Sequence, residues 1–260
     1  MKGIVLAGGA GSRLLPLTKI VSKQLLPVFD KPLIFYPLSL LMLSNIREIL
    51  IICAESQLGK FQDLLLDGSD LGLSITYKVQ ERPEGIAQSY IIAEDFLAGS
   101  KSALVLGDNI FHGPGLGRKL ETFNAVLGAQ IFGYTVSNPQ QYGVALIDEE
   151  HRVITLEEKP ATTTSNIAIP GLYFLDENAS DYSKTLKQSA RGELEIIDLL
   201  RIYQQKNELK LEMLPRGTAW FDSGTFNDLH DASTYVRLME ERTGERVGDP
   251  FEVAKNQGWI

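Results

Sequence analysis

The sequence predicts an α/β fold, a Rossmann-like mixed sheet that is mostly parallel and flanked by helices, with a β-rich half behind it. Three observations predict this fold. Short apolar runs alternate with amphipathic stretches in the first half of the chain, which is typical of parallel strands covered by helices on both faces. In the second half, strand patterns follow one another with little helix. The chain has 260 residues, of which 44% are hydrophobic, and this suffices for one large domain.

The first half supplies four strands and three helices. Residues 3–6 and 48–53 are short apolar runs, the pattern of strands that are buried on both faces. Residues 74–79 alternate between apolar and polar types, and residues 103–106 form a last apolar run that ends at Gly107. In such folds ligands bind at the carboxyl ends of the strands. The apolar residues between these strands have helical spacing at 33–43, which we expect to pack in the core, and at 58–66 and 85–97.

The second half is richer in strands. Four strand patterns separated by turns come first, and a fifth follows between two helical patterns. No linker rich in Ser, Pro or Gly and no internal repeat divides the sequence, so we expect a single domain. The expected strands are 130–135, 143–147, 152–157, 167–174 and 208–214, and the expected helices are 193–206 and 226–242.

Composition and charge argue against several classes of function. The chain has 25 basic and 33 acidic residues, a net charge of −8, which disfavours a nucleic-acid partner or an anionic membrane surface. The single cysteine, Cys53, cannot form an internal disulfide and is best explained as a small buried apolar residue. The three histidines lack the spacing of a zinc site. No apolar run approaches the ~20 residues of a membrane span, and the chain opens on a strand pattern without a signal peptide, so we expect a cytoplasmic location.

A glycine-rich loop follows the first strand. Gly8, Gly9 and Gly11 let the backbone approach a ligand closely and turn several N–H groups toward an anion. The loop lacks the third glycine of a dinucleotide fingerprint and the Gly-Lys-Ser/Thr ending of a Walker A loop. Taken alone, it is explained equally well as a tight turn. Arg13 directly after the loop and Lys23 shortly beyond it favour a phosphate site. The planar guanidinium of arginine and the ammonium of lysine both suit the negative charge of a triphosphate.

Further motifs follow this loop in order along the chain. They include Gly-Gly-Ala-Gly-Ser-Arg-Leu at 8–14, Ser-Lys-Gln-Leu-Leu-Pro-Val at 22–28, Gly-Asp-Asn at 107–109, Glu-Glu-Lys-Pro at 157–160 and Trp-Phe-Asp-Ser-Gly at 220–224. Together they resemble the motifs of the sugar-nucleotide pyrophosphorylases, and most closely those of the glucose-1-phosphate thymidylyltransferases. Because they extend from residue 3 to residue 224, they are more specific than any single loop.

The resemblance implies that different segments of the chain bind the two substrates. A single nucleotidyltransferase domain over 1–260 would have a nucleotide-binding half at about 1–125, a sugar-phosphate-binding half at about 126–225 and a helical tail at 226–260. Its substrates would be dTTP and glucose 1-phosphate, with no nucleic acid and no membrane as partner. The resemblance also suggests a homotetramer that serves deoxysugar and cell-surface polysaccharide synthesis.

The nucleotide would be held by the glycine loop and its neighbours. By the resemblance, Arg13 and Lys23 are catalytic, and Lys23 reaches the reacting α-phosphate. The amide of Gln80 can pair with a pyrimidine edge, although Gln80 alone would be explained as a solvated loop residue. The implied nucleotide-binding residues are Leu6, Gly8, Gly9, Gly11, Ser12, Gln24, Gln80, Pro83 and Gly85.

Asp108 and Asp222 are the catalytic carboxylates and magnesium ligands that the resemblance implies. Asp108 follows Gly107 at the carboxyl end of an expected strand, and Asp222 precedes Ser223. Mg²⁺ usually takes one or two carboxylates together with phosphate oxygens and waters, so these two residues suffice. Each aspartate alone would be explained more simply as a turn or a helix cap, and it is the family pattern that favours Mg²⁺ as the cofactor.

The sugar and its phosphate would bind in the second half. Glu158 suits a pair of hexose hydroxyls, and Lys159 and Arg191 suit a phosphate dianion. Without the resemblance, they would be explained as a surface ion pair that contributes little. Pro170 stands where the family usually has threonine and removes a backbone donor from the strand expected at 167–174. The implied set is Asn109, Tyr142, Gly143, Glu158, Lys159, Ile169, Tyr173 and Arg191.

The resulting hypothesis is a magnesium-dependent enzyme in which glucose 1-phosphate attacks the α-phosphorus of dTTP in line. Positioning and charge neutralisation would then carry the catalysis. A uridylyl- or cytidylyltransferase acting on a hexose 1-phosphate is an alternative that differs mainly in the base pocket. A non-catalytic sugar-nucleotide-binding regulator is another, but it would be expected to lack Arg13, Lys23 or Asp108, and all three are present.

A regulatory site is a further expectation from the resemblance. Relatives use a longer C-terminal region and neighbouring helices to form a second nucleotide site, whereas this chain ends at Ile260. His112 also stands where the family commonly has tyrosine. We therefore expect weak or altered allosteric inhibition by the sugar nucleotide at the end of the pathway.

Overall fold

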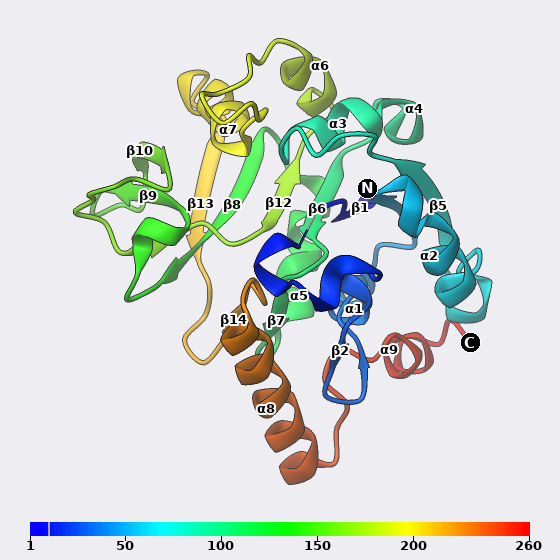
Figure 1. Ribbon diagram of the computed structural model, residues 1–260. Coiled ribbons are helices and arrows are strands. Elements are labelled where there is room, and N and C mark those ends of the chain that lie inside the picture. The colour runs from blue at the N-terminus through cyan, green and yellow to red at the C-terminus, as the bar shows by residue number, and fades with distance from the viewer. Residues whose placement is uncertain (10) are drawn as a thin grey trace. The chain divides into compact units, whose positions relative to one another are not determined.

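The protein is described by a computed structural model that covers residues 1–9 and 11–260, so Ala10 of the glycine loop lies outside the described residues. The chain divides into two compact units that are interleaved in the sequence (Figure 1). We call them the terminal unit and the central unit. The terminal unit comprises Lys2–Pro83, Val105–Thr122 and Gly217–Ile260, and the central unit comprises Met1, Glu84–Leu104 and Phe123–Arg216.

A parallel sheet is the framework of the terminal unit. The strand β1 (Lys2–Ala7) pairs with β4 (Glu48–Cys53), which pairs in turn with β5 (Ser74–Val79), all in parallel. Every residue of β4 after Glu48 is buried, as expected of a strand whose two faces are both covered. Because β1 ends at Ala7, the glycine loop begins at the carboxyl edge of this sheet.

The helices of the terminal unit differ in how much of their surface is buried. Residues 36–42 of the first helix are buried without interruption, so this apolar segment packs in the core as predicted. Its Pro37 lies in the first turn, where a backbone N–H has no helical partner to lose. The helices are α1 (Phe35–Leu43), α2 (Leu58–Leu65), α5 (Leu116–Glu121), α8 (Phe226–Thr243) and α9 (Pro250–Asn256).

Two short antiparallel pairs complete the terminal unit. The strand β14 (Ala219–Phe221) pairs with β7 (Ile110–His112) and leads through a short turn into α8. That helix begins at a capping box, in which the Thr225 hydroxyl accepts from the Asp228 N–H (3.2 Å) and the Asp228 carboxylate accepts from the Thr225 N–H (2.9 Å). The hairpin of β2 (Pro27–Val28) and β3 (Lys31–Pro32) is tied to α8 by Lys31, whose ammonium donates to Glu240 (2.7 Å).

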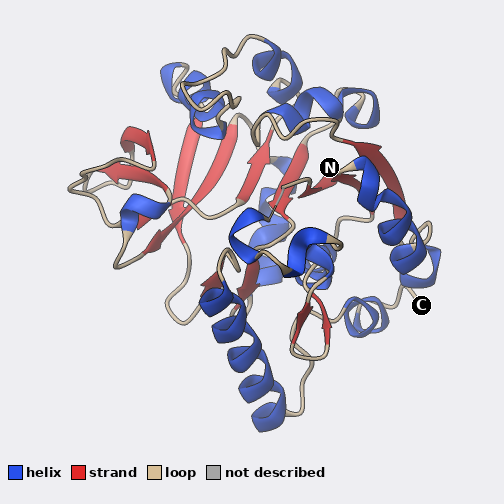
Figure 2. Ribbon diagram, in the orientation of Figure 1, coloured by secondary structure: helices blue, strands red, loops and turns tan. Residues whose placement is uncertain are grey.

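The central unit has a mixed sheet built on β8 (Ala129–Thr135) (Figure 2). The strand β13 (Leu209–Met213) runs parallel to it, and β11 (Ile167–Ala168) and β12 (Leu172–Leu175) run antiparallel. The hairpin of β9 (Gly143–Ile147) and β10 (Val153–Glu158) joins this sheet where β9 pairs with β11. β6 (Ser102–Leu106) spans the boundary between the two units. The helices are α3 (Gln88–Ile92), α4 (Glu94–Leu97), α6 (Ala179–Lys184) and α7 (Ile196–Gln205).

A mixed sheet flanked by helices confirms the predicted fold class, but two predicted elements are wrong. The strand expected at 167–174 is interrupted after Ala168, because Pro170 has no N–H for the sheet and its carbonyl accepts from the Leu172 N–H (2.8 Å) in a turn. The helix expected at 85–97 begins only at Gln88 and is broken at Ala93. Its first residue, Gly85, has a φ of +105°, which no helix contains.

The structure also bears on two smaller predictions. Cys53 is completely buried, and burial raises the pKa of its thiol to about 11, as expected of a small core residue. Over residues 1–9 and 11–260, no helix is long and apolar enough to cross a bilayer.

Candidate active site

The glycine loop lies against a side chain that the sequence assigns to the same site. A β-carbon on Gly8 would lie 2.0 Å from the Gln80 Oε1 atom, so only glycine lets that amide occupy its position. Gln80 is 5% exposed, and its backbone N–H donates to the Cys53 carbonyl at the end of β4 (2.8 Å). Gly11 has a φ of +60°, and its carbonyl accepts from the Thr18 hydroxyl (2.8 Å). The loop and Gln80 therefore form one surface at the carboxyl edge of the parallel sheet.

A short turn at Lys23–Leu25 places a buried cation near this loop. Lys23 is 8% exposed, and its ammonium forms an ion pair with the Asp108 carboxylate. Lysine is seldom buried unless it is paired, so Asp108 stabilises Lys23 in this position. Gln24 is also buried and packs on Gly107, where a β-carbon would lie 2.9 Å from the Gln24 Cγ atom.

The Asp108 carboxylate has a second partner. The Asn109 Nδ2 atom donates to Asp108 Oδ1 (2.8 Å), and the Asn109 Oδ1 atom accepts from the indole Nε1 of Trp220 (2.7 Å). Asn109 is 2% exposed. Its expected contact with the sugar phosphate stays a prediction, and the structure places its amide between Asp108 and Trp220. The sequence could not show this link, because residues 109 and 220 meet only in the folded chain.

Asp222 follows β14 in a strained turn. Ser223 has a φ of +45°, a region that non-glycine residues rarely adopt, and it is completely buried. Burial raises the pKa of Asp222, and the charges of Asp228 and Asp108 raise it further. Because the charge of Asp108 acts on Asp222, the fold brings the two predicted metal ligands into one electrostatic environment.

Arg13 lies against the same turn. A β-carbon on Gly224 would lie 2.7 Å from Arg13 Nη2 and 3.1 Å from Arg13 Cζ. The guanidinium also lowers the pKa of Asp222, although this effect is smaller than those of burial and the neighbouring carboxylates. Sequence reasoning missed the role of Gly224, because a sequence does not show which side chain approaches a glycine.

The two carboxylates fit a hard divalent cation. Carboxylate oxygens are the ligands that Mg²⁺ prefers, and it completes its shell with phosphate oxygens and waters. The raised pKa of Asp222 reflects burial first and neighbouring negative charge second, and a bound cation would offset both. In the part of the chain that the structure describes, no group of three or more His, Cys, Asp or Glu residues is placed to hold a metal ion. Asp108 and Asp222 would therefore depend on a substrate and water for the remaining ligands.

The residues expected to bind the sugar phosphate gather in the central unit, apart from Asn109. Arg191 donates through Nη2 and Nε to the two carboxylate oxygens of Glu195 (2.8 and 3.1 Å) and through Nη2 to Glu158 (3.2 Å). The ammonium of Lys159 lies 3.8 Å from Glu158 Oε1. Burial raises the pKa of Glu158, whereas Lys159 and Arg191 lower it. The two cations are exposed and lie among three carboxylates. Glu158 is half-buried, Glu195 is buried, and Glu193 Oε2 lies 3.6 Å from Arg191 Nη2.

The other residues predicted to bind the sugar phosphate lie on or beside the hairpin of β9 and β10. A β-carbon on Gly143 would lie 3.2 Å from Glu158 Oε2, and the Tyr142 carbonyl accepts from the Lys159 N–H (3.0 Å). Ile169 and Tyr173 are buried, with 5% and 3% of their surface exposed. The Ile169 N–H donates to the Gly143 carbonyl (2.8 Å).

The remaining predicted nucleotide-binding residues are divided between the units. Gly85 belongs to the central unit, where a β-carbon would lie 2.3 Å from the Leu194 carbonyl oxygen. The others belong to the terminal unit: the Leu6 carbonyl accepts from the Gly107 N–H (2.9 Å), and Gly9, Ser12 and Pro83 are exposed.

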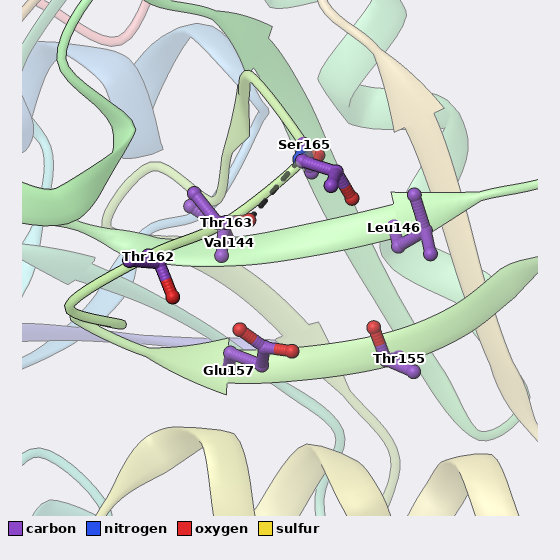
Figure 3. Close-up of a pocket in the computed structure, with 8 residues that line it drawn as sticks. Val144, Leu146, Thr155, Glu157, Thr162, Thr163 and Ser165 are labelled. Atoms are coloured by element: carbon purple, nitrogen blue, oxygen red, sulfur yellow. Dashed lines mark hydrogen bonds between the residues drawn. The ribbon is translucent and has the colours of Figure 1, made fainter.

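A hollow of about 300 Å³ lies on the face of the β9–β10 hairpin that is opposite to Glu158 (Figure 3). Val144 and Leu146 of β9 pair across the strands with Glu157 and Thr155 of β10, and the loop at 162–165 lies beside them. Successive side chains of a strand point to opposite faces, so Glu157 lines the hollow while Glu158 points away from it. The hollow is thus separate from the cluster around Arg191.

A larger hollow of about 500 Å³ lies in the terminal unit among α1, α5 and α9. His112 is part of its wall, and the His112 Nδ1 atom lies 2.7 Å from the Tyr235 hydroxyl oxygen. Burial lowers the pKa of His112. Trp259 lies elsewhere, with the Arg47 guanidinium 4.9 Å from the centre of its ring. The expected change in allosteric inhibition stays a prediction.

Comparisons with known proteins agree with these observations. A family model described as nucleotidyl transferase matches residues 2–237. The glucose-1-phosphate thymidylyltransferase of Xanthomonas campestris pv. campestris (strain B100) is 54% identical over 260 residues, which are 100% of this chain and 88% of that protein. The enzyme of the same name from Mycolicibacterium smegmatis is 51% identical over 100% of this chain and 90% of its own length.

Solved structures give the same result for the fold. A glucose-1-phosphate thymidylyltransferase from Bacillus anthracis, in complex with sucrose, superposes with a TM-score of 0.84 and 38% identity, over 91% of this chain and 95% of that chain. A UDP-glucose pyrophosphorylase complexed with UDP-glucose superposes with a TM-score of 0.81 over 92% of this chain and 98% of that chain. Its identity is 21%, so this second likeness concerns the fold alone.

Proposed function

The chain belongs to the nucleotidyl transferase family and, within it, to the glucose-1-phosphate thymidylyltransferases, and from this premise we propose that it converts dTTP and α-D-glucose 1-phosphate into dTDP-glucose and pyrophosphate. The observation that carries the proposal is the convergence of Lys23, Asp108, Arg13 and Asp222 in the terminal unit, which also holds the glycine loop. Two cations and two carboxylates arranged in this way suit a triphosphate and its metal ion.

The triphosphate binds to the glycine loop, Arg13 and Lys23. Backbone N–H groups of the loop donate to phosphate oxygens, and the Arg13 guanidinium can donate to two of them at once. Lys23 is paired with Asp108 in the free protein, so it is held in place before the nucleotide arrives. On binding, Lys23 exchanges this carboxylate for an oxygen of the α-phosphate, where it stabilises the charge of the transition state.

Asp108 and Asp222 are the residues that would hold Mg²⁺. The bound ion would polarise the phosphate oxygens and offset negative charge during the transfer. The raised pKa of Asp222 supports this assignment, because a buried carboxylate beside two others is costly to ionise without a cation.

The base is recognised by Gln80. Its amide, which packs directly on Gly8, offers one donor and one acceptor to a pyrimidine edge. The alternative uridylyl- and cytidylyltransferases would use the same phosphate site and differ mainly in this base pocket. We assign dTTP because the relatives that match the whole chain bear the thymidylyltransferase name.

The sugar phosphate binds to the cluster around Arg191. Lys159 and Arg191 supply positive charge to the phosphate dianion, and Glu158 accepts hydrogen bonds from hexose hydroxyls. An oxygen of this phosphate then forms a bond to the α-phosphorus while the bond between that phosphorus and the bridging oxygen to the β-phosphate breaks. Pyrophosphate leaves with the electron pair. The attacking oxygen is already anionic, so we expect no general base.

Three further features belong to the proposal by the same resemblance. The enzyme works in the cytoplasm, forms a homo-oligomer that is a tetramer, and supplies dTDP-rhamnose, deoxysugar or polysaccharide synthesis.

Stereochemistry tests the proposed reaction. One diastereomer of dTTP carrying sulfur on the α-phosphorus is incubated with glucose 1-phosphate and Mg²⁺, and the configuration of the product is read by ³¹P NMR. A single in-line displacement inverts the configuration at phosphorus. Retention would mean a covalent enzyme intermediate and would contradict the mechanism, and the absence of any sugar nucleotide would favour the non-catalytic regulator.

A further inference from the structure

We propose that Asn109 and Trp220 are a positioning pair that fixes the Asp108 carboxylate for metal binding and couples it to Asp222 through the pairing of β7 with β14. This inference rests on the proposed function, because it concerns the same metal site.

The two oxygens of the Asp108 carboxylate have different partners. Asp108 Oδ1 accepts from the Asn109 amide (2.8 Å), and Asp108 Oδ2 pairs with the Lys23 ammonium. The Asn109 amide thereby fixes the rotation of the carboxylate and leaves Oδ2 for a cation. In the free protein that cation is Lys23. Lys23 would give up Asp108 Oδ2 to a metal ion and would then be free to reach the α-phosphate.

Trp220 determines which way the Asn109 amide points. An amide presents a donor at one end and an acceptor at the other, and a flipped amide would place its oxygen against the Asp108 carboxylate. The indole N–H can only donate, so its bond to Asn109 Oδ1 (2.7 Å) requires the NH₂ group to face Asp108. Asn109 is 2% exposed, so water competes little for these bonds. The Trp220 ring is itself held by stacking on Phe111, with 6.5 Å between the ring centres.

The strand pairing places both carboxylates at one end of a short ladder. Ile110 pairs with Phe221, and Phe111 pairs with Trp220, in antiparallel register. Asp108 and Asn109 come directly before β7, and Asp222 comes directly after β14. In an antiparallel pair, the start of one strand lies beside the end of the other. The hydrogen bond from Trp220 to Asn109 joins the two strands at this end of the ladder. A shift of either strand would therefore change the distance between Asp108 and Asp222.

Removing one N–H group tests the pair. Outer-shell partners of metal ligands typically contribute 10- to 100-fold to metal affinity. Trp220→Phe keeps a ring on Phe111 and deletes the donor, and Asn109→Ala deletes the amide. The affinity for Mn²⁺ is measured from the EPR signal of free Mn²⁺, for the protein alone and for the protein with dTTP in the absence of glucose 1-phosphate. We expect each variant to bind Mn²⁺ about 10-fold more weakly, and the double variant to be little worse than either single one.

Trp259→Phe is the matched control. Trp259 is the other tryptophan of the chain and lies beneath Arg47, away from the pair. This substitution has the same chemistry as Trp220→Phe and should leave the Mn²⁺ affinity unchanged. Excess Mg²⁺ should also restore turnover to Trp220→Phe, which a general loss of structure would not allow.

The wild-type protein provides a readout that needs no variant. Its two indole N–H groups give two signals in a ¹H–¹⁵N spectrum, and Mg²⁺ should shift that of Trp220 and leave that of Trp259 in place. Wild-type affinity in both Trp220→Phe and Asn109→Ala, or a Trp220 signal that ignores Mg²⁺ while Mn²⁺ binds, would overturn the positioning pair and leave the metal site intact. If Mn²⁺ binds the wild-type protein neither alone nor with dTTP, or binds Asp108→Asn and Asp222→Asn as tightly, the metal assignment of the proposed function fails, and the pair fails with it.

Discussion

A methyl group added at Gly224 should reduce turnover without reducing stability. In Gly224→Ala the new β-carbon would lie 2.7 Å from Arg13 Nη2, whereas ordinary contact begins at 3.4 Å, so the guanidinium must move by at least 3.4 − 2.7 = 0.7 Å. Gly224 does not have a positive φ, so alanine fits the backbone. The group that must yield is the end of an exposed, flexible side chain, and we expect the free energy of unfolding to change by less than ~0.5 kcal/mol.

The magnitude of the kinetic effect follows from this displacement. A misplacement of about 1 Å can cost about 100-fold in rate, so a shift of 0.7 Å should lower kcat by roughly 10- to 100-fold. The KM for glucose 1-phosphate should change less, because Arg13 is assigned to the nucleotide. Complete removal of the cation in Arg13→Ala should lower kcat by about 100-fold or more.

The assay is pyrophosphate release at saturating substrates, with thermal melting as the measure of stability. Gly59→Ala in α2 is the control, because a β-carbon there meets no atom within 4 Å, and it should retain full turnover. In an Arg13→Ala background, Gly224→Ala should cause no further loss. Full turnover in Gly224→Ala, or an equal loss with and without Arg13, would refute the assignment of Gly224 as the residue that makes room for Arg13.

In Gly8→Ala a β-carbon 2.0 Å from Gln80 Oε1 displaces the amide, so calorimetry should show weaker dTTP binding, and unchanged affinity would contradict the role of Gln80 in the base site. Arg191→Ala should weaken glucose 1-phosphate binding and spare dTTP binding, with the exposed Arg152→Ala as control, and an equal loss for both ligands would oppose the sugar-phosphate assignment. The folded-state pKa of Asp222 is raised above its unfolded value, so its contribution to stability is complete below the unfolded pKa and is lost as pH rises through the folded pKa. Without metal, Asp222→Asn should therefore gain thermal stability relative to the wild type between pH 3 and pH 7. An equal difference between the two proteins at both pH values would show that the pKa of Asp222 is not raised.

The sequence predicted the parts of the fold that depend on local pattern. The apolar runs of β1 and β4 and the alternation of β5 identify these strands, because the burial of each strand is visible in its own residues. β7 and β14 could not be found in this way. Each has three residues, too few for a period, and they become strands only because they pair with each other.

The same distinction holds for the candidate site. The motifs identified Arg13, Lys23, Asp108 and Asp222. The structure pairs Lys23 with Asp108 and places Arg13 against Gly224, where its charge lowers the pKa of Asp222. The motifs could not show that Trp220 donates to Asn109, or that Gly224 makes room for Arg13. The break in the helix predicted at 85–97 has a similar origin. Gly85 adopts a positive φ against the Leu194 backbone, a contact between segments far apart in the sequence.

The choice of nucleotide tests the central claim most directly. Pyrophosphate release is measured with glucose 1-phosphate and, in turn, dTTP, UTP, CTP, ATP and GTP at one Mg²⁺ concentration. We predict the highest kcat/KM with dTTP, and the loss of most of that activity in Asp108→Asn and in Asp222→Asn. A higher kcat/KM with another nucleotide, or no pyrophosphate from any of the five, would contradict the assignment of this chain as a glucose-1-phosphate thymidylyltransferase.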